Sequence, residues 1–588
     1  MMKKLFLSII SLALAGGAYA QLNTFSDGDT ISAEKMNQNF QHLEQQFRGT
    51  RTTTVNCAAG EKIGDAIDNG YTNITVSGTC AENLQFSMWR EDSAENSTPT
   101  GKLAPRFLRI AGADSSAKIV DTSSNTESTV SVTDGATLLL EDITISGGQY
   151  AVNAQHNTNL YLSGVTVENF TEKGIRVGDS ALLGIDDDGA TIIGTENSTG
   201  IELVTGASGW IYSVNISNVD RGLGVYGGSM IYLDSYQISA VSQGISVGNS
   251  HVLNSGDGSA SIEGTSDRAV SVSHGVFTNW EGILEIKNLK GGRGINLWMS
   301  QGNIRNLKML DFNNLGSGGN SAIRVDANSS FILEGAEISG STDRALIQFS
   351  NHSGGGISDS TITATSAGEV VSIETGSAVE VEEGSIITAT SVGVGISVGG
   401  NSLLKFRNST LSGTATDGSL IGLGDSSSGE IRDSTLTLIS NEDGIRVGGS
   451  SRLNLRESTI SCTCTDGNLV KISQGSSAEI RDANLTLNNG KRAIYVAESS
   501  DVNIRNTTIF GTATEELIGV TRVSNAILRN ESSLGQTSTE NPDVSVSNLS
   551  FLDVWNNETL INKVDCYNKG YVSANEGIVT DLATSCTE

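Results

Sequence analysis

The chain has 588 residues and a formal net charge of −29 at pH 7, and it contains 68 glycines but only 3 prolines. A protein this acidic repels nucleic acid and anionic membranes, so we expect neither as a partner. The glycine content favours short strands joined by tight turns.

Residues 1–20 have the pattern of a secretory signal peptide. Lys3 and Lys4 precede the apolar run 5–15, and the small-residue motif at 18–20 ends the segment. No later stretch is long and apolar enough to span a bilayer as a helix. We therefore expect a secreted or surface-associated protein that is exported through a cleaved signal peptide and has no transmembrane segment.

Residues 21–56 form an N-terminal segment with a short amphipathic helix, predicted over 30–48. Ser32 can serve as its N-cap. The apolar side chains that follow have heptad spacing, and they are Ala33, Met36, Phe40, Leu43 and Phe47. We expect this helix to dock on the rest of the protein or on a partner segment. A small oligomerising coil is the alternative.

Residues 57–546 are dominated by a repeat. One unit, Gly444–Asn468, holds three short runs in which apolar and polar side chains alternate, with Gly, Ser, Asn and Asp between the runs. Successive units begin between Tyr150 and Leu517, at intervals of about 24 to 25 residues. One unit cannot bury its own apolar face, so the units must stack. The pattern predicts an all-β parallel solenoid of three-strand coils.

Four of the cysteines lie near the two ends of this repeat. Cys57 and Cys80 bracket its beginning, and Cys566 and Cys586 lie in residues 547–588, which we expect to form a C-terminal cap. We expect each pair to form a disulfide that clamps one end and contributes about 3 kcal/mol in the loop-entropy model. Spacing alone does not establish the connectivity. Disulfides also agree with export.

The other two cysteines, Cys462 and Cys464, lie inside the repeat. They alternate with Ser461 and Thr463, so they share one face of a strand. We expect both to be small core residues.

The stretch EKIGDAIDNGYTNITVSGTCAENLQF, residues 61–86, resembles the opening of right-handed parallel β-helix proteins of the pectin-lyase-like group. In that group a short helix precedes a turn of the type I-x-V-x-x-G-x-x-x-E-N and covers the open end of the core. The resemblance implies a right-handed parallel β-helix over about residues 57–550, with short N-terminal helices. It implies no single activity, because this fold hosts lyases, hydrolases, esterases, epimerases, adhesins and scaffolds.

Six arginines recur at one position in successive coils, directly after the last apolar residue of the second strand. Stacking should make them a ladder with a spacing of about 4.8 Å. Each is followed by Asn, Asp or Glu, which favours a self-compensating structural corner. The alternative is a stripe that binds an anionic polymer such as a uronic-acid polysaccharide, since arginine suits carboxylates. The six are Arg407, Arg432, Arg456, Arg481, Arg505 and Arg529.

Aromatic residues gather in the middle third of the chain. Tyr212 and Tyr232 lie between apolar positions in successive coils, and Trp298 follows later. Outward-facing rings of this kind could form a platform for sugars. Cross-strand packing explains them equally well.

Candidate catalytic residues coincide in the region 244–352. They are His251, His274, Arg268 and Arg344. A lyase needs a base beside the carbon that loses its proton, and a cation such as Arg or Ca²⁺ to stabilise the resulting charge. The chain lacks the Asp-Asp with Gly-His-Gly, the Asp-Pro-His-Asp and the Arg-x-Pro-x-x-Arg patterns of enzymes with this fold. We therefore expect solvated corner histidines.

A turn at Asp186-Asp187-Asp188-Gly189 offers carboxylates for Ca²⁺. Three consecutive acids on a turn do not converge on one point, so we expect a solvated turn, and no metal or cofactor.

The sequence predicts a secreted or surface-associated β-helix that binds an extended polysaccharide or a surface, in the manner of an adhesin or scaffold, without catalysis. The alternative is a polysaccharide lyase that acts on an acidic glycan. A groove lined with His, Arg and acids would favour the enzyme, and flat faces would favour the binder.

Overall fold

The computed structural model describes residues 51–574, with gaps at 88–101, 104–106, 255, 257, 315–319, 366–367, 416–417, 531, 537–540, 556–560 and 562. The predicted signal peptide, the helix predicted over 30–48 and Cys586 lie outside the described residues. None of the helices within the described ranges is long and apolar enough to cross a bilayer.

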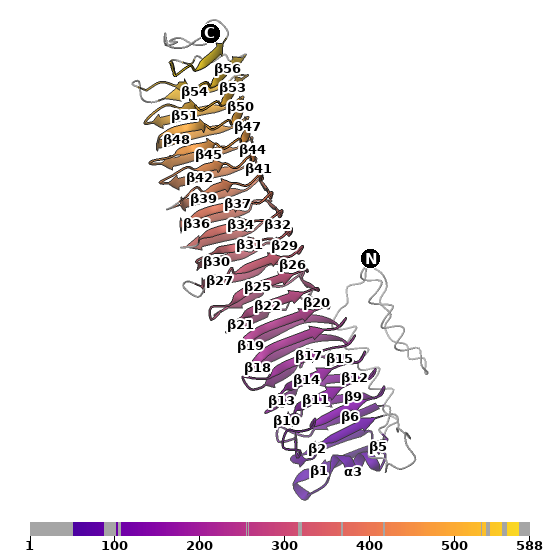
Figure 1. Cartoon of the computed structure of the whole chain (residues 1–588). Helices are drawn as coiled ribbons and strands as arrows, with labels where there is room; N and C mark the ends of the chain where they lie inside the picture. The colour runs from indigo at the N-terminus through magenta and orange to yellow at the C-terminus, as the bar shows by residue number, and fades with distance from the viewer. Residues whose placement is uncertain are drawn as a thin grey trace.

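The described chain winds into an elongated parallel solenoid of about 20 turns (Figure 1). Each turn gives one strand to each of three long sheets. In one turn these strands are β44 (Arg452–Arg456), β45 (Thr459–Cys464) and β46 (Asn468–Ile472), and we name the sheets that contain them sheet 1, sheet 2 and sheet 3. The predicted all-β solenoid of three-strand coils is therefore confirmed.

The register between neighbouring turns reproduces the repeat in the sequence. On sheet 1, β44 pairs with β41 (Ser428–Arg432) on one side and with β47 (Ser477–Arg481) on the other. Leu455 thereby lies between Ile431 and Ile480, which are 24 and 25 residues away along the chain. Residues with the same place in the repeat consequently form columns along the rod.

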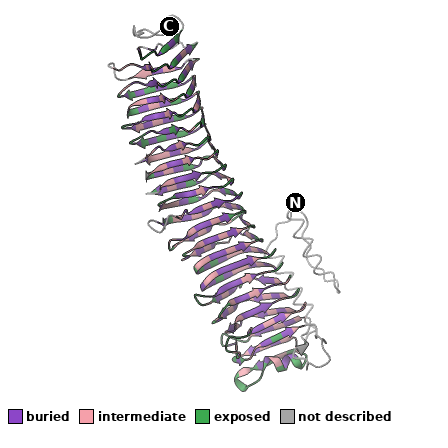
Figure 2. Ribbon diagram, viewed as in Figure 1, coloured by how far each residue is buried: buried purple, intermediate pink, exposed green. Residues whose placement is uncertain are grey.

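One continuous apolar core runs along the inside of the solenoid (Figure 2). Leu455, Ile480 and Ile504 belong to one column, and each is 0% exposed. Burying an aliphatic side chain of this size contributes about 1.5 to 3 kcal/mol. The polar residues that alternate with them point outward, so each sheet has a packed inner face and an accessible outer face.

Two kinds of corner join the sheets. Between sheets 1 and 2, a single residue in the left-handed conformation turns the chain, for example Asp433, Glu457 and Asp482, with φ values of 50°, 50° and 53°. Between sheets 3 and 1, buried serines stack in a second ladder, in which each hydroxyl accepts a hydrogen bond from the backbone N–H of the serine one turn earlier. Its members from Ser329 onward are Ser329, Ser353, Ser377, Ser402, Ser427, Ser451, Ser476, Ser500, Ser524 and Ser550.

A short helix lies at the N-terminal end of the rod. This is helix α3 (Ile63–Asp68) (Figure 1). Its residues Ile63, Ala66 and Ile67 are buried. The carboxylate of Glu82 accepts hydrogen bonds from the first helical N–H groups, those of Ile63 and Gly64, at 2.8 and 3.0 Å. A carboxylate at this end satisfies amides that have no partner within the helix.

The predicted disulfide between Cys57 and Cys80 is present, and it joins residues 23 apart in the sequence beside this helix. Cys566 is also disulfide-bonded. Its predicted partner lies outside the described residues, so that pairing stays a prediction.

Cys462 and Cys464 correct the sequence analysis. Both are core residues with 0% exposure, as expected, but they form a disulfide with each other. Residues two apart on a strand share a face, and here the Cα atoms are 5.6 Å apart, which is within reach of a disulfide. The prediction treated both residues as packing groups and overlooked this partnership.

Candidate functional site

The six arginines form a ladder on the outer face of sheet 1. Each ends its strand and lies opposite the next, with a spacing of about 4.8 Å between strands. The ladder runs over β38 (Leu403–Arg407), β41, β44, β47, β50 (Asp501–Arg505) and β53 (Asn525–Arg529).

Carboxylates offset the charge of the first four arginines. Arg407 lies between Glu380 and Glu430, at 3.1 and 2.9 Å, and the hydrogen bond to Glu430 is the main cause that raises the pKa of Arg407. The remaining three have one or two acidic partners at 2.8 to 3.3 Å. Over these four turns, neighbouring carboxylates therefore neutralise the arginines, as the structural-corner interpretation of the ladder predicts.

The last two arginines differ from the first four. Arg505 contacts the neutral amide of Asn503 at 3.4 Å. Among the described residues, neither Arg505 nor Arg529 has a carboxylate within ion-pair distance. The C-terminal end of the ladder therefore presents cations that the described structure does not neutralise by direct contact.

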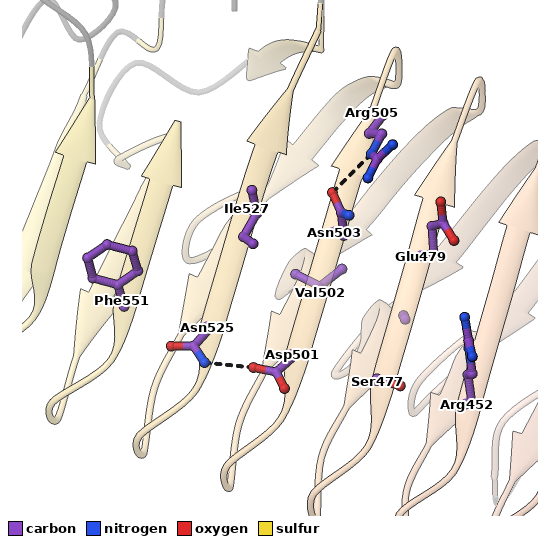
Figure 3. A pocket seen from close by; sticks show the side chains of 11 residues that line it. Arg452, Ser477, Glu479, Asp501, Val502, Asn503, Arg505, Asn525, Ile527 and Phe551 are labelled. Atoms are coloured by element: carbon purple, nitrogen blue, oxygen red, sulfur yellow. Dashed lines mark hydrogen bonds between the residues drawn. The ribbon is translucent and has the colours of Figure 1, made fainter. Parts of the chain in front are cut away.

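An open hollow of about 520 Å³ lies beside this end of the ladder, on the outer face of sheet 1 (Figure 3). It extends across β44, β47, β50, β53 and β56 (Phe551–Trp555). Its volume falls in the range of ordinary ligand sites. The lining residues are Arg452, Ser477, Ala478, Glu479, Asp501, Val502, Asn503, Arg505, Asn525, Ile527 and Phe551.

The polar groups of the hollow are both donors and acceptors. Asn525 donates to the carboxylate of Asp501 at 2.7 Å, and both lie on the floor that Figure 3 shows. The two arginines and two acids of the lining balance each other, so the hollow has no strong net charge. Balanced hydrogen-bonding groups of this kind suit hydroxyl-rich ligands, because each hydroxyl both donates and accepts.

Exposed aromatic rings continue this surface towards the C-terminal end of the rod. Phe551 is 39% exposed and lies opposite Tyr571, which is 40% exposed. Trp555, 55% exposed, lies opposite Arg529 at the end of the ladder. Aromatic faces next to hydrogen-bonding groups can hold a ring that is apolar on one face and polar at its edge.

The two predicted platform tyrosines lie on long strands that pass through all three sheets, β18 (Ser208–Tyr226) and β19 (Met230–Gly248). Their rings meet edge to face, with centroids 6.4 Å apart. The register places Trp210, not Tyr212, opposite Tyr232. Burial is the main cause that raises the pKa of Tyr212, with smaller effects from Tyr232 and nearby carboxylates. These contacts agree with cross-strand packing better than with a free platform.

Three of the remaining candidates, Arg268, Arg344 and Trp298, lie on or beside sheet 3. Arg268 begins β22 (Arg268–Ser273) and its Nε lies 3.5 Å from Asp267. Arg344 is exposed directly before β31 (Ala345–Phe349). Trp298 ends β25 (Arg293–Trp298) and is 42% exposed. Arg268, Arg344 and Trp298 thus lie in one region of the rod.

The two candidate histidines, His251 and His274, do not form a catalytic arrangement with these arginines. His274 lies at the corner after β22, where its Nδ1 is 3.0 Å from the hydroxyl of Ser273. His251 begins β20 (His251–Asn254) on sheet 1. Within the described part of the chain, no hydrogen bond or ion pair joins either histidine to Arg268 or Arg344. The described contacts therefore do not join these histidines and arginines into an acid–base pair.

No group of three or more His, Cys, Asp and Glu side chains could hold a metal ion within the described ranges. At the predicted acidic turn, burial raises the pKa of Asp186, while Ser163 and the N–H of Gly189 donate hydrogen bonds that lower it. These contacts fit a structural turn.

The comparison with family models agrees with this geometry. Residues 394–559, which hold the arginine ladder and the hollow, match the family described as right handed beta helix region. Together with the stacked three-strand turns, the match defines the protein as a right-handed parallel β-helix. A comparison with curated proteins finds no match. The likeness of residues 61–86 to the pectin-lyase-like group stays a prediction.

The sequence analysis missed most of the hollow. Asp501, Asn503, Asn525 and Phe551 occupy the outward positions two and four residues before the ladder position, so the same repeat alignment could have found them. Arg293, which follows two glycines, was also not among the predicted site residues.

Proposed function

We propose that this protein is a secreted or surface-associated, non-catalytic binder of an extended polysaccharide, which it holds along the C-terminal half of sheet 1. The observation that carries the proposal is the hollow over β44 to β56, which is open, lined with balanced donors and acceptors, and continued by exposed aromatic rings.

The shape of this surface supports a polymer as the ligand. The hollow crosses five successive strands and lies parallel to the arginine ladder, so its lining extends along the rod axis. An extended chain of sugar units can contact the lining in several successive turns at once, and many weak contacts then add up along one molecule. The two arginines without acidic partners add sites for any carboxylates on that chain.

The absence of catalysis in this proposal follows from where the titratable groups lie. The described lining of the hollow contains no histidine, and its two acids have partners: Glu479 pairs with Arg456 at 3.3 Å and Asp501 with Asn525. A lyase would need a free base aimed at the sugar. The lyase alternative has only the separated residues around sheet 3 to draw on.

The proposal is tested by retention of the purified protein on immobilised neutral and acidic polysaccharides, with product release measured in the same samples. Phe551→Ala should reduce retention at least tenfold, because it removes the aromatic face of the hollow. Phe510→Ala is the matched control, since Phe510 is also exposed, at 49%, but lies on sheet 2 in β51 (Thr508–Ala513).

The binding function is supported if the unmodified protein is retained without releasing product, if Phe551→Ala loses this retention and if Phe510→Ala keeps it. Release of unsaturated products or new reducing ends would overturn it in favour of the enzyme. Equal losses in both variants, or no retention of the unmodified protein on any polysaccharide, would also overturn it.

A further inference from the structure

Four successive turns each place one arginine on or at the edge of the outer face of sheet 3. Arg268 and Arg293 lie directly opposite each other on β22 and β25, about 4.8 Å apart at the backbone. Arg324 lies on the next strand, β28 (Ile323–Asp326), opposite Asn296, and Arg344 precedes β31. We call these four residues the sheet 3 arginine cluster.

The cluster is electrostatically unfavourable by itself. Burial lowers the pKa of Arg293, and the charges of Arg324, Arg268 and Arg344 lower it further, while Asp267 acts in the opposite direction. Stacked cations with restricted access to water repel one another unless an anion lies between them. In a chain with a net charge of −29, this concentration of positive charge needs an explanation.

The acids around the cluster do not fully compensate it. Asp267 pairs with Arg268 at 3.5 Å, and Asp326 pairs with Arg324. Asp326 is 2% exposed and also accepts hydrogen bonds from Ser350 and Asn351, so its carboxylate is committed to the corner. Asp343, which directly precedes Arg344 in the sequence, is also engaged in an interaction.

Arg293, at the centre of the cluster, lacks an ion pair within the described structure. Its side chain donates a hydrogen bond from Nη1 to the neutral amide oxygen of Asn296, at 3.3 Å. This contrasts with Arg407 and Arg432 on sheet 1, which each have two carboxylates in reach. A half-buried guanidinium with donors to spare is a binding group for an oxyanion.

An exposed aromatic ring completes the site. Trp298 lies on the same strand as Arg293 and Asn296, and the register places it between Ser273 and Asp326 on the neighbouring strands. Its indole is 42% exposed. A ligand whose anionic group reaches the arginines can therefore lay a ring on this surface.

We propose that the sheet 3 arginine cluster binds an oxyanion, a carboxylate, sulfate or phosphate group, carried by a ligand whose ring contacts Trp298. This site does not rest on the proposed polysaccharide surface. It lies on sheet 3 between β22 and β31, whereas the hollow lies on sheet 1 between β44 and β56.

Calorimetric titration of the full chain with inorganic sulfate, phosphate and acetate, at low ionic strength, tests the site. We expect at least one anion to bind, and Arg293→Gln to weaken that binding at least tenfold. Arg432→Gln is the matched control, because it removes the same charge from the self-compensated part of the sheet 1 ladder. The order of the affinities for the three anions shows whether the site prefers a tetrahedral group, as in sulfate and phosphate, or a planar one, as in acetate.

A second comparison isolates the ring contact. Trp298→Ala should leave the affinity for the inorganic anion unchanged and should weaken binding of glucuronate or a sulfated monosaccharide. Binding of no anion, equal weakening by Arg293→Gln and Arg432→Gln, or no change in Arg293→Gln would each overturn the proposal. Polysaccharide binding at the hollow is tested separately with Phe551→Ala. A negative result for one of the two sites therefore does not decide the other.

Discussion

Arg481 and Arg505 lie directly opposite each other on neighbouring strands of sheet 1, yet among the described residues only Arg481 is paired with a carboxylate, that of Asp482 at 2.8 Å. The same column of the repeat thus changes character between two turns. Asp482 is the corner residue directly after Arg481, and its carboxylate holds that cation at the corner. After Arg505 the corner residue is Asn506, which donates instead to Asp482 of the previous turn.

This difference predicts unequal effects of the same substitution. Arg505→Gln should reduce retention on polysaccharide severalfold, because Arg505 lines the hollow and its cation is not held by a carboxylate. Arg481→Gln should leave retention unchanged, because Arg481 is outside the lining and is paired. Retention assays on both variants, with circular dichroism to confirm folding, make the comparison. Equal losses would mean that the whole ladder binds the polymer.

The serine ladder between sheets 3 and 1 should contribute more to the stability of the folded protein than the small size of its side chains suggests. The hydroxyl of Ser402 accepts from the N–H of Ser377 at 3.2 Å and donates to the carbonyl of Gly399 at 2.6 Å, and Ser402 is 2% exposed. Ser402→Ala removes the partner of the buried Ser377 N–H and of the partly buried Gly399 carbonyl, at a cost of about 1 to 3 kcal/mol.

Thermal unfolding and amide hydrogen exchange check this prediction. We expect a lower unfolding temperature and faster exchange at Ser377 in Ser402→Ala. Ser428→Ala, which removes a hydroxyl from the outward face of β41 in the next turn, is the control and should change neither. An unchanged exchange rate at Ser377 would show that another group or water takes over the hydrogen bond.

The two disulfides with described partners should stabilise the protein unequally. Cys57–Cys80 closes a loop over 23 residues, whereas Cys462–Cys464 joins residues 2 apart. In the loop-entropy model the first contributes about 3 kcal/mol and the second much less. Replacing Cys57 and Cys80 with alanine should therefore expose the N-terminal end, including α3, to proteolysis.

Alanine at Cys462 and Cys464 is the matched comparison. These positions lie in the same columns as Gly413 and Ala415, so small residues already fit there two turns earlier. Limited proteolysis and unfolding of both double variants should show the larger loss for the Cys57–Cys80 pair. The reverse order would mean that the buried pair stabilises the core through more than loop closure.

The sequence predicted the fold well because the repeat determines it locally. Alternation with a period of two marks each strand, and Gly, Asn and Asp mark each corner, so the period and the in-register arginines followed directly. The pairing of Cys462 with Cys464 was missed because it depends on the side-chain geometry within one strand. The hollow was missed because it arises across five strands, from residues that are unremarkable in any one turn, such as Asn503 and Asn525.

Acid sensitivity should begin at the corner that holds Asp121. Burial raises the pKa of Asp121, but hydrogen bonds from Ser123, Asn83 and Asn125 outweigh burial and hold the pKa at about 2. Because this value lies below that of an unfolded aspartate, about 3.9, the carboxylate stabilises the folded protein above pH 4. The contribution declines as the pH falls from about 4 towards 2.

Asp121→Asn should remove that pH-dependent part of the stability. The difference in unfolding temperature between the unmodified protein and the variant should be largest near pH 6 and should shrink as the pH approaches 2. Asp466→Asn, which changes an exposed carboxylate at another turn, is the control for the lost charge. A difference that stays constant from pH 6 to pH 2 would show that Asp121 acts through its shape and hydrogen bonds rather than through its charge.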